Sequence, residues 1–238
     1  MSYTTSNCGS IPAKSSPYWD RNGAGKTTLL RAISGLLPRT GDIRFGGIDL
    51  GKAGSREIAK SGLVHVIEGH RIFTQLTVSD NLLLAAYDCP SGEHRSRIDE
   101  ALLYFPEIAA KRHDRGSSLS GGQQQMLAVA QALVRRPRLL MLDEPSAGLS
   151  PVLVDRVLSV VNQLRESGTA VLLVEQLVDK ALAVSDRVYA MAKGKFVFDA
   201  NANEPNVPQR LEEAYFGETQ RRMPISEQVR AQDVAGEA

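Results

Sequence analysis

The sequence predicts an α/β fold with a largely parallel sheet. Short apolar segments alternate with amphipathic stretches along most of the chain, and a glycine-rich turn leads directly into one of these stretches. Strands that alternate with helices usually form parallel sheets, because each crossover helix returns the chain to the same end of the sheet. A chain of 238 residues is long enough for one large core with an inserted subdomain.

The first half of the chain supplies the first predicted helix and two predicted strands. Apolar residues recur at helical spacing over 29–37, directly after the glycine-rich turn. Ile43 and Phe45 alternate as in a sheet strand. The apolar run 63–67 predicts a further strand of the sheet, which ends just before Glu68.

The character of the sequence changes over 71–118, where amphipathic helical stretches follow one another. Thr77 begins a capping sequence for an apolar helix that ends near Leu84, and 93–104 forms a second amphipathic stretch. We interpret 71–118 as a helical subdomain inserted between two segments of the α/β core.

The second half returns to alternating elements. Ser120 and Gln123 have the spacing of a capping box, which predicts a helix from there to about Val134. Ser150 and Pro151 mark the start of another helix. The other predicted elements are strands at 139–142 and 170–174, a helix at 178–184, and a hairpin of 188–191 with 196–198.

Bulk composition excludes several classes of protein. Hydrophobic residues make up 42% and charged residues 23%, with a net charge of +1, so overall charge gives no reason to expect nucleic acid as a partner. Cys8 and Cys89 are too few for a disulfide scaffold. No apolar run is long enough to cross a bilayer, so any membrane role requires a partner. The histidines lack metal-ligand spacing and are expected on the surface or in loops: His65, His70, His94 and His113.

The glycine-rich turn reads NGAGKTT over 22–28 and predicts a phosphate-binding loop. In such a loop, backbone N–H groups surround a phosphate, a lysine reaches its outer oxygens, and a hydroxyl group binds Mg²⁺. Lys26 and Thr27 take the last two roles here. The nucleotide-binding set at this turn is Asn22, Gly23, Ala24, Gly25, Lys26, Thr27 and Thr28.

An acidic pair follows the predicted strand at 139–142. Asp143 ends a hydrophobic segment, where a charge is costly unless a metal ion or hydrogen bonds compensate it. We therefore expect it at the metal site with Thr27, holding Mg²⁺ through a water molecule. Glu144 is the candidate general base for an attacking water molecule. Alone, the pair could also be an acidic strand end that caps the next element.

A third motif, LSGGQ over 119–123, opens the helix that ends near Val134. Ser120, Gly121, Gly122 and Gln123 place a hydroxyl group and free backbone N–H groups at a helix N-terminus, where anions bind. The alternative is an ordinary capped helix, but two glycines in a first turn weaken a helix.

The three motifs in this order resemble the ATP-binding-cassette (ABC) ATPases, from about residue 22 to 217. The resemblance implies a P-loop NTPase core that binds ATP and Mg²⁺ and pairs with a second ATPase subunit. In this family, the signature at 119–123 contacts the phosphate held by the other subunit. The implied partners are transmembrane permease subunits and, indirectly, a solute-binding protein, which places the chain at the cytoplasmic face of the inner membrane.

Two variant positions refine the resemblance. Glu68 stands where many cassette ATPases have glutamine, and Gln176 stands where most have the switch histidine. Both variants, and the ending AYFG over 214–217, are similar to one ATP-binding subunit of branched-chain amino-acid importers, which implies a heterodimer. Gln176 can orient groups at the γ-phosphate by hydrogen bonding, but it cannot titrate near neutral pH. We therefore count Glu144 and Gln176 as catalytic, and Glu68 and Asp143 as nucleotide-site residues.

The N-terminus departs from the family pattern. Residues 1–20 contain no apolar strand, and Asp20 replaces the first glycine of the phosphate loop, which predicts weaker ATP binding. A degenerate, non-catalytic subunit or truncated remnant is therefore an alternative, and a DNA-repair cassette ATPase is a third.

We divide the chain into an irregular N-terminal segment (1–20), two segments of the ATPase core (21–70 and 119–216) with the helical subdomain (71–118) between them, and a flexible tail (217–238).

Overall fold

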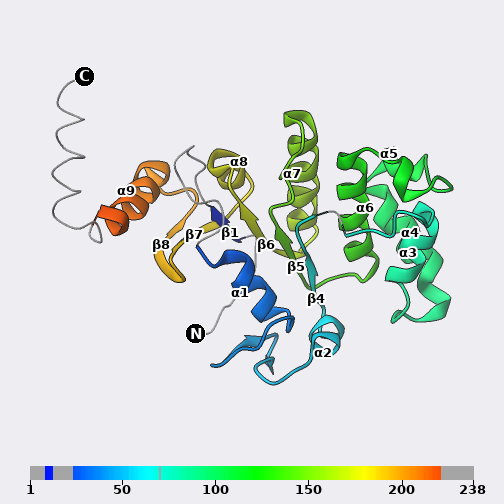
Figure 1. The fold of residues 1–238 in the computed structure, drawn as a ribbon, viewed down its shortest axis with the longest axis horizontal. Coiled ribbons are helices and arrows are strands. Elements are labelled where there is room, and N and C mark those ends of the chain that lie inside the picture. Colours follow the sequence, from blue (N-terminus) through cyan, green and yellow to red (C-terminus); the bar gives the residue numbers. More distant parts are fainter. Residues whose placement is uncertain (1–8, 13–23, 70, 221–238) are drawn as a thin grey trace.

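A six-stranded sheet forms the centre of the computed structural model, which describes residues 9–12, 24–69 and 71–220 (Figure 1). The strands lie in the order β4-β5-β6-β1-β7-β8, and all are parallel to their neighbours except β8, which runs antiparallel to β7. The expected fold class is confirmed. The strands are β1 (Gly9–Pro12), β4 (Leu63–Val66), β5 (Leu139–Asp143), β6 (Ala170–Glu175), β7 (Arg187–Ala192) and β8 (Lys195–Asn201).

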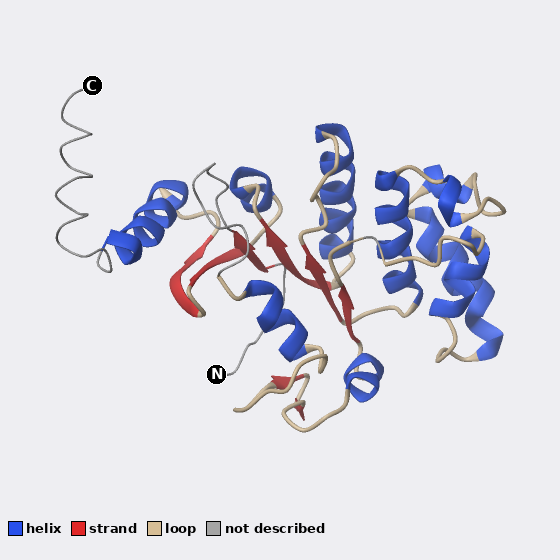
Figure 2. Ribbon diagram, viewed as in Figure 1, coloured by secondary structure: helices blue, strands red, loops and turns tan. Residues whose placement is uncertain are grey.

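Helices cover both faces of this sheet (Figure 2). Along β5, Leu140 and Leu142 join the core cluster beneath one layer of helices, whereas Met141 joins the cluster on the opposite face. This alternation follows from the period of two in a strand. One face carries α1 (Lys26–Ile33) and α2 (Ser55–Lys60), and the other carries α6 (Gly121–Val134), α7 (Pro151–Glu166) and α8 (Val178–Ala183).

The strand expected around Ile43 and Phe45 does not join the main sheet. Arg44–Phe45 (β2) pairs with Ile48–Asp49 (β3) in a separate two-stranded hairpin. Gly46 and Gly47 both have positive φ values, 55° and 82°. A two-residue turn of this kind reverses the chain at once, so the short strands pair with each other.

The region between β4 and β5 is helical, as the sequence predicts. Its elements pack around α6, and Phe105 is fully buried among them. Thr77 caps the first helix by accepting a hydrogen bond from the backbone N–H of Asp80 at 3.1 Å. The elements are α3 (Val78–Ala85), η1 (Ser91–Glu93), α4 (His94–Leu103), α5 (Pro106–Ala109) and η2 (Gly116–Ser118).

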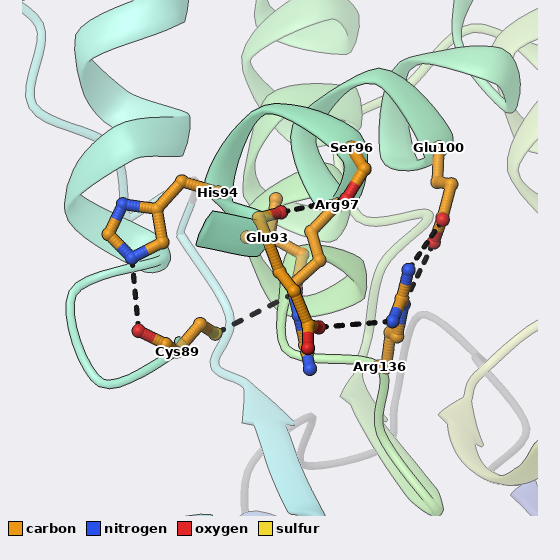
Figure 3. A network of polar contacts seen from close by, with 8 residues as sticks. Cys89, Glu93, His94, Ser96, Arg97, Glu100 and Arg136 are labelled. Atoms are coloured by element: carbon orange, nitrogen blue, oxygen red, sulfur yellow. Dashed lines mark hydrogen bonds and ion pairs between the residues drawn. The ribbon is translucent and has the colours of Figure 1, made fainter. Parts of the chain in front are cut away.

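A polar network ties this helical region to the end of α6 (Figure 3). Arg136 pairs with Glu93 at 3.3 Å and with Glu100 at 2.5 Å, and Arg97 donates to the Val134 carbonyl at 3.4 Å. Exposed ion pairs each contribute only about 0–1 kcal/mol. The network therefore fixes the orientation of α4 more than it adds to stability.

The structure corrects the expectation of an irregular segment over 1–20. Gly9–Pro12 forms β1, which pairs with β6 on one side and β7 on the other. The sequence GSIP contains no apolar run, so side-chain pattern could not reveal it. A strand in the middle of a sheet is stabilised by backbone hydrogen bonds on both sides, and these do not depend on side chains. The remaining residues of 1–20 lie outside the described part of the chain.

The C-terminal end also differs from the expectation. Helix α9 (Val207–Gln220) includes the first residues of the segment interpreted as a flexible tail, and residues 221–238 lie outside the described part. Val207 and Leu211 are buried against Val188 and Ala200 of the β7–β8 hairpin. Within the described residues, no helix is both long and apolar enough to span a membrane.

His65 is not a surface or loop residue, contrary to the sequence interpretation. It lies on β4, where its Nδ1 is 3.0 Å from the Ser34 hydroxyl at the end of α1. Its buried Nε2 has no hydrogen-bond partner among the described residues. Burial, with the nearby Arg31 charge, lowers the pKa of His65 from 6.5 to about 4. His94 begins α4 and His113 is exposed, whereas His70 lies outside the described residues.

This pKa predicts an acid-sensitive contribution to stability. Between pH 6.5 and about 4, the unfolded chain binds a proton at His65 that the folded chain does not, so stability falls as pH falls. The full loss is up to about 3 kcal/mol. Urea unfolding at pH 7.5 and pH 5 should show a smaller pH difference for His65→Gln than for the natural chain, and the same difference for the exposed control His113→Gln.

Candidate functional site

The candidate site lies at the carboxyl end of the parallel strands. Asp143 ends β5 and is followed by Glu144, and Gln176 follows β6. Glu68 is an exposed residue in the turn after β4, near enough for its charge to act on Asp143. Ligands of open α/β sheets bind at this end, because the loops that follow the strands converge there.

The described part of the phosphate loop runs from Ala24 into α1. Gly25 is the N-cap residue with φ 87°, a left-handed conformation that glycine adopts without strain. The backbone N–H of Gly194, in the β7–β8 turn, donates to the Ala24 carbonyl at 3.0 Å and supports the loop from outside. Three positions singled out in the sequence lie outside the described residues: Asp20, Asn22 and Gly23.

Lys26 begins α1 and is buried, with 7% of its surface exposed. Burial lowers the pKa of its ammonium group, while the charges of Glu144 and Asp143 act in the opposite direction. The structure therefore brings the predicted phosphate-binding lysine into the field of the acidic pair Asp143 and Glu144. Thr28, another residue of the predicted nucleotide-binding set, is exposed at the first turn of α1.

Thr27 and Asp143 meet directly, although they are far apart in the sequence. The Thr27 hydroxyl donates to Asp143 Oδ1 at 3.1 Å, and the buried Oδ2 has no hydrogen-bond partner among the described residues. Burial raises the pKa of Asp143, and the hydrogen bond from Thr27 lowers it. An adjacent hydroxyl and an unsatisfied carboxylate oxygen fit Mg²⁺, which takes one or two protein oxygen ligands and completes its shell with water and phosphate.

Glu144 and Gln176 also meet. Gln176 Nε2 donates to Glu144 Oε2 at 2.5 Å, and the Glu144 backbone N–H donates to the Val174 carbonyl at 2.9 Å. Glu144 has φ 47°, a left-handed conformation that is uncommon for a residue with a side chain. The two residues predicted to be catalytic thus form one hydrogen-bonded unit.

The signature turn is anchored on the helical side of the molecule. Ser120 and Gln123 form the predicted capping box, and Lys111 Nζ donates to Gln123 Oε1 at 3.2 Å. A Cβ atom at Gly122 would lie 2.3 Å from Leu153 Cδ1, so this glycine allows α6 to approach α7 closely. Gly122 therefore has a packing role that its sequence context did not indicate, whereas Ser120 and Gly121 are exposed.

Sequence reasoning missed one buried polar group at this edge. Glu175, the last residue of β6, is buried and accepts hydrogen bonds from Ser146. The sequence pattern that identified Asp143, a carboxylate at the end of an apolar strand, could also have identified Glu175. The family pattern points to the next position, Gln176, and so gives Glu175 no role of its own.

This fold and this site define an ATP-hydrolysing nucleotide-binding domain. The family model described as ABC transporter matches residues 21–147. The chain belongs to the ABC transporter family, as one of its ATPase subunits.

Several relatives share most of the chain. It is 36% identical over 197 residues to the high-affinity branched-chain amino acid transport ATP-binding protein BraG of Pseudomonas aeruginosa, covering 82% of this chain and 84% of that one. It is 39% identical over 201 residues to the probable branched-chain amino acid transport ATP-binding protein LivF of Archaeoglobus fulgidus, with the same coverage. It is 32% identical to the lipopolysaccharide export system ATP-binding protein LptB of Escherichia coli K12, covering 83% of each chain.

Solved structures support the fold. A nucleotide-free ATP-binding cassette from an ABC transporter has a TM-score of 0.74 and 21% identity, covering 87% of this chain and 85% of that one. An ATP-binding cassette in its ADP conformation has a TM-score of 0.73 and 22% identity, covering 89% and 88%. The comparisons do not support the degenerate alternative or the impairment expected from Asp20.

Proposed function

We propose that this chain energises a branched-chain amino-acid importer by binding and hydrolysing ATP. The observation that carries the proposal is the pair of contacts that joins Thr27 to Asp143 and Gln176 to Glu144. The relatives BraG and LivF, which are named for branched-chain amino acid transport, support the choice of solute.

The proposed role of each site residue follows from its chemistry. Lys26 and the N-terminus of α1 bind the phosphates, because both present positive charge at one point. Glu144 accepts the proton of the attacking water, and Gln176 orients its carboxylate. Thr27 and Asp143 would hold Mg²⁺, which would neutralise developing phosphate charge when bound. Glu68, with the helical subdomain that follows it, would face the permease partners.

The signature surface requires a partner. We propose that Ser120, Gly121, Gly122 and Gln123 contact a nucleotide held by a second ATPase subunit, in a heterodimer. Transmembrane permease subunits would anchor the pair to the cytoplasmic face of the inner membrane, with the helical subdomain at 71–118 facing them and a solute-binding protein delivering the amino acid. We also propose that residues 21–70 and 119–216 together form the ATPase core.

Uptake of labelled leucine tests the proposal in a host strain from which this chain has been deleted. The natural chain should restore uptake, and Lys26→Ala should not, because the phosphates lose their buried cation. The exposed control Lys52→Ala should restore uptake fully. If deletion leaves uptake of leucine, isoleucine and valine unchanged, the proposed solute is wrong, whatever the chain hydrolyses in the test tube.

A further inference from the structure

A deeply buried carboxylate lies between the two strand ends that carry the catalytic pair. Glu175 is 2% exposed at the end of β6, and the proposed mechanism gives it no role. A buried charge is costly unless hydrogen bonds compensate it. Burial raises the pKa of Glu175, and the hydrogen bonds from Ser146 lower it. Burying a carboxylate beside the proposed catalytic residues costs free energy, so we expect Glu175 to serve a function there.

The hydrogen bonds of Glu175 connect the segments that follow two different strands. Its Oε1 accepts from the Ser146 backbone N–H at 3.0 Å, and its Oε2 accepts from the Ser146 hydroxyl at 2.6 Å. Oε2 also accepts from the backbone N–H of Gln176 at 3.2 Å. One carboxylate therefore holds the segment after β5 and the segment after β6 together.

Glu144 lies two residues before Ser146, in the segment that this carboxylate holds. Its left-handed conformation, φ 47°, is one that a glutamate rarely adopts, and such conformations persist only where the surroundings impose them. The Glu144 backbone contact with Val174 fixes one end of the segment, and the Ser146 contacts with Glu175 fix the other. Between these ends, the Glu144 carboxylate meets Gln176.

We propose that Glu175 is a positioning residue for ATP hydrolysis, which holds Glu144 and Gln176 in mutual register through Ser146 and the Gln176 backbone. The inference rests on the proposed roles of Glu144 and Gln176. Glu175 itself moves no proton, and it acts on the catalytic side chains only through the segments that it holds. Its effect is confined to the rate of the chemical step, because the phosphate-binding residues lie in the phosphate loop and at the start of α1.

The test compares kcat and KM for ATP in the complex assembled from this chain, or one of its variants, with its partner subunits. Ser146→Ala removes the 2.6 Å hydrogen bond with little change in packing. Glu175→Gln keeps one acceptor oxygen but replaces the other with an amide N–H₂, which cannot accept from the backbone N–H of Ser146 or of Gln176. Both should lower kcat, and Glu175→Ala should lower it by about 10–100-fold, the range for a misplaced catalytic group. KM should change less than about two-fold, since misplacement affects the transition state more than ground-state binding.

A double variant separates positioning from general loss of structure. Ser146→Ala combined with Glu175→Gln should lose no more activity than the more damaging single change, because both weaken the same link between Ser146 and Glu175. The exposed serine control Ser159→Ala should behave as the natural chain. Thermal unfolding of each variant gives the folded fraction at the assay temperature.

The possible results distinguish a positioning role of Glu175 from a structural one. If kcat falls only in proportion to the folded fraction, if KM rises with it, or if the two changes add, Glu175 is structural and the inference is wrong. If the natural chain hydrolyses ATP and all variants match it, this inference fails while the proposed function stands. If the complex containing the natural chain does not hydrolyse ATP, the proposed catalytic roles fail and the inference fails with them.

Discussion

Replacing Glu144 by glutamine is expected to slow ATP hydrolysis by roughly 10²–10⁴-fold, the usual contribution of a general base. The substitution keeps the size of the side chain and an oxygen that can accept from Gln176 Nε2, so the local geometry should survive. What it removes is the ability to take a proton from water. ATP affinity should stay within about two-fold, because the amide still occupies the same place beside the bound phosphate.

Two measurements on the complex of this chain with its partner subunits check this result. Phosphate release gives the hydrolysis rate, and equilibrium titration with ATP gives the affinity. Glu166→Gln, an exposed change at the end of α7, serves as the matched control and should leave both unchanged. An unaltered rate in Glu144→Gln would mean that another group accepts the proton, and a collapse of affinity would mean that Glu144 belongs to the binding surface instead.

The predicted elements that match the structure are those with a repeating side-chain pattern. The capping box at Ser120 and Gln123 begins α6 where the sequence places it, and the apolar run before Asp143 forms β5. The elements that sequence failed to reveal lack such a pattern. β1 is stabilised by backbone pairing with β6 and β7, and this pairing does not require the apolar side-chain pattern from which strands are predicted.

In the candidate site, too, the sequence predicted the individual residues but not the contacts between them. Motif chemistry identified Lys26, Thr27, Asp143 and Glu144 one at a time, and the structure brings them together because β5 ends beside the start of α1. Motif chemistry could not show that Gln176 contacts Glu144, since that contact depends on the pairing of β5 with β6. The role of Gly122 was hidden for a similar reason, because it depends on the approach of the Leu153 side chain from α7.

Asparagine at position 143 is expected to lower Mg²⁺-dependent hydrolysis by at least about 100-fold, because an isosteric amide offers a cation one neutral oxygen instead of a carboxylate. Asp143 Oδ2 is buried and has no hydrogen-bond partner among the described residues, so the change puts an N–H₂ group or a neutral oxygen where the charge now lies. Folding should not suffer, since burial already raises the pKa of this carboxyl group and removing its charge relieves a desolvation cost.

The measurement is hydrolysis as a function of Mg²⁺ concentration, alongside ATP binding in EDTA. Asp143→Asn should bind metal-free ATP at least as well as the natural chain and require far more Mg²⁺ for activity, whereas the exposed control Asp155→Asn should follow the natural chain in both assays. An Mg²⁺ dependence that is the same in Asp143→Asn and the natural chain would remove Asp143 from the metal site and leave its unsatisfied oxygen without a function.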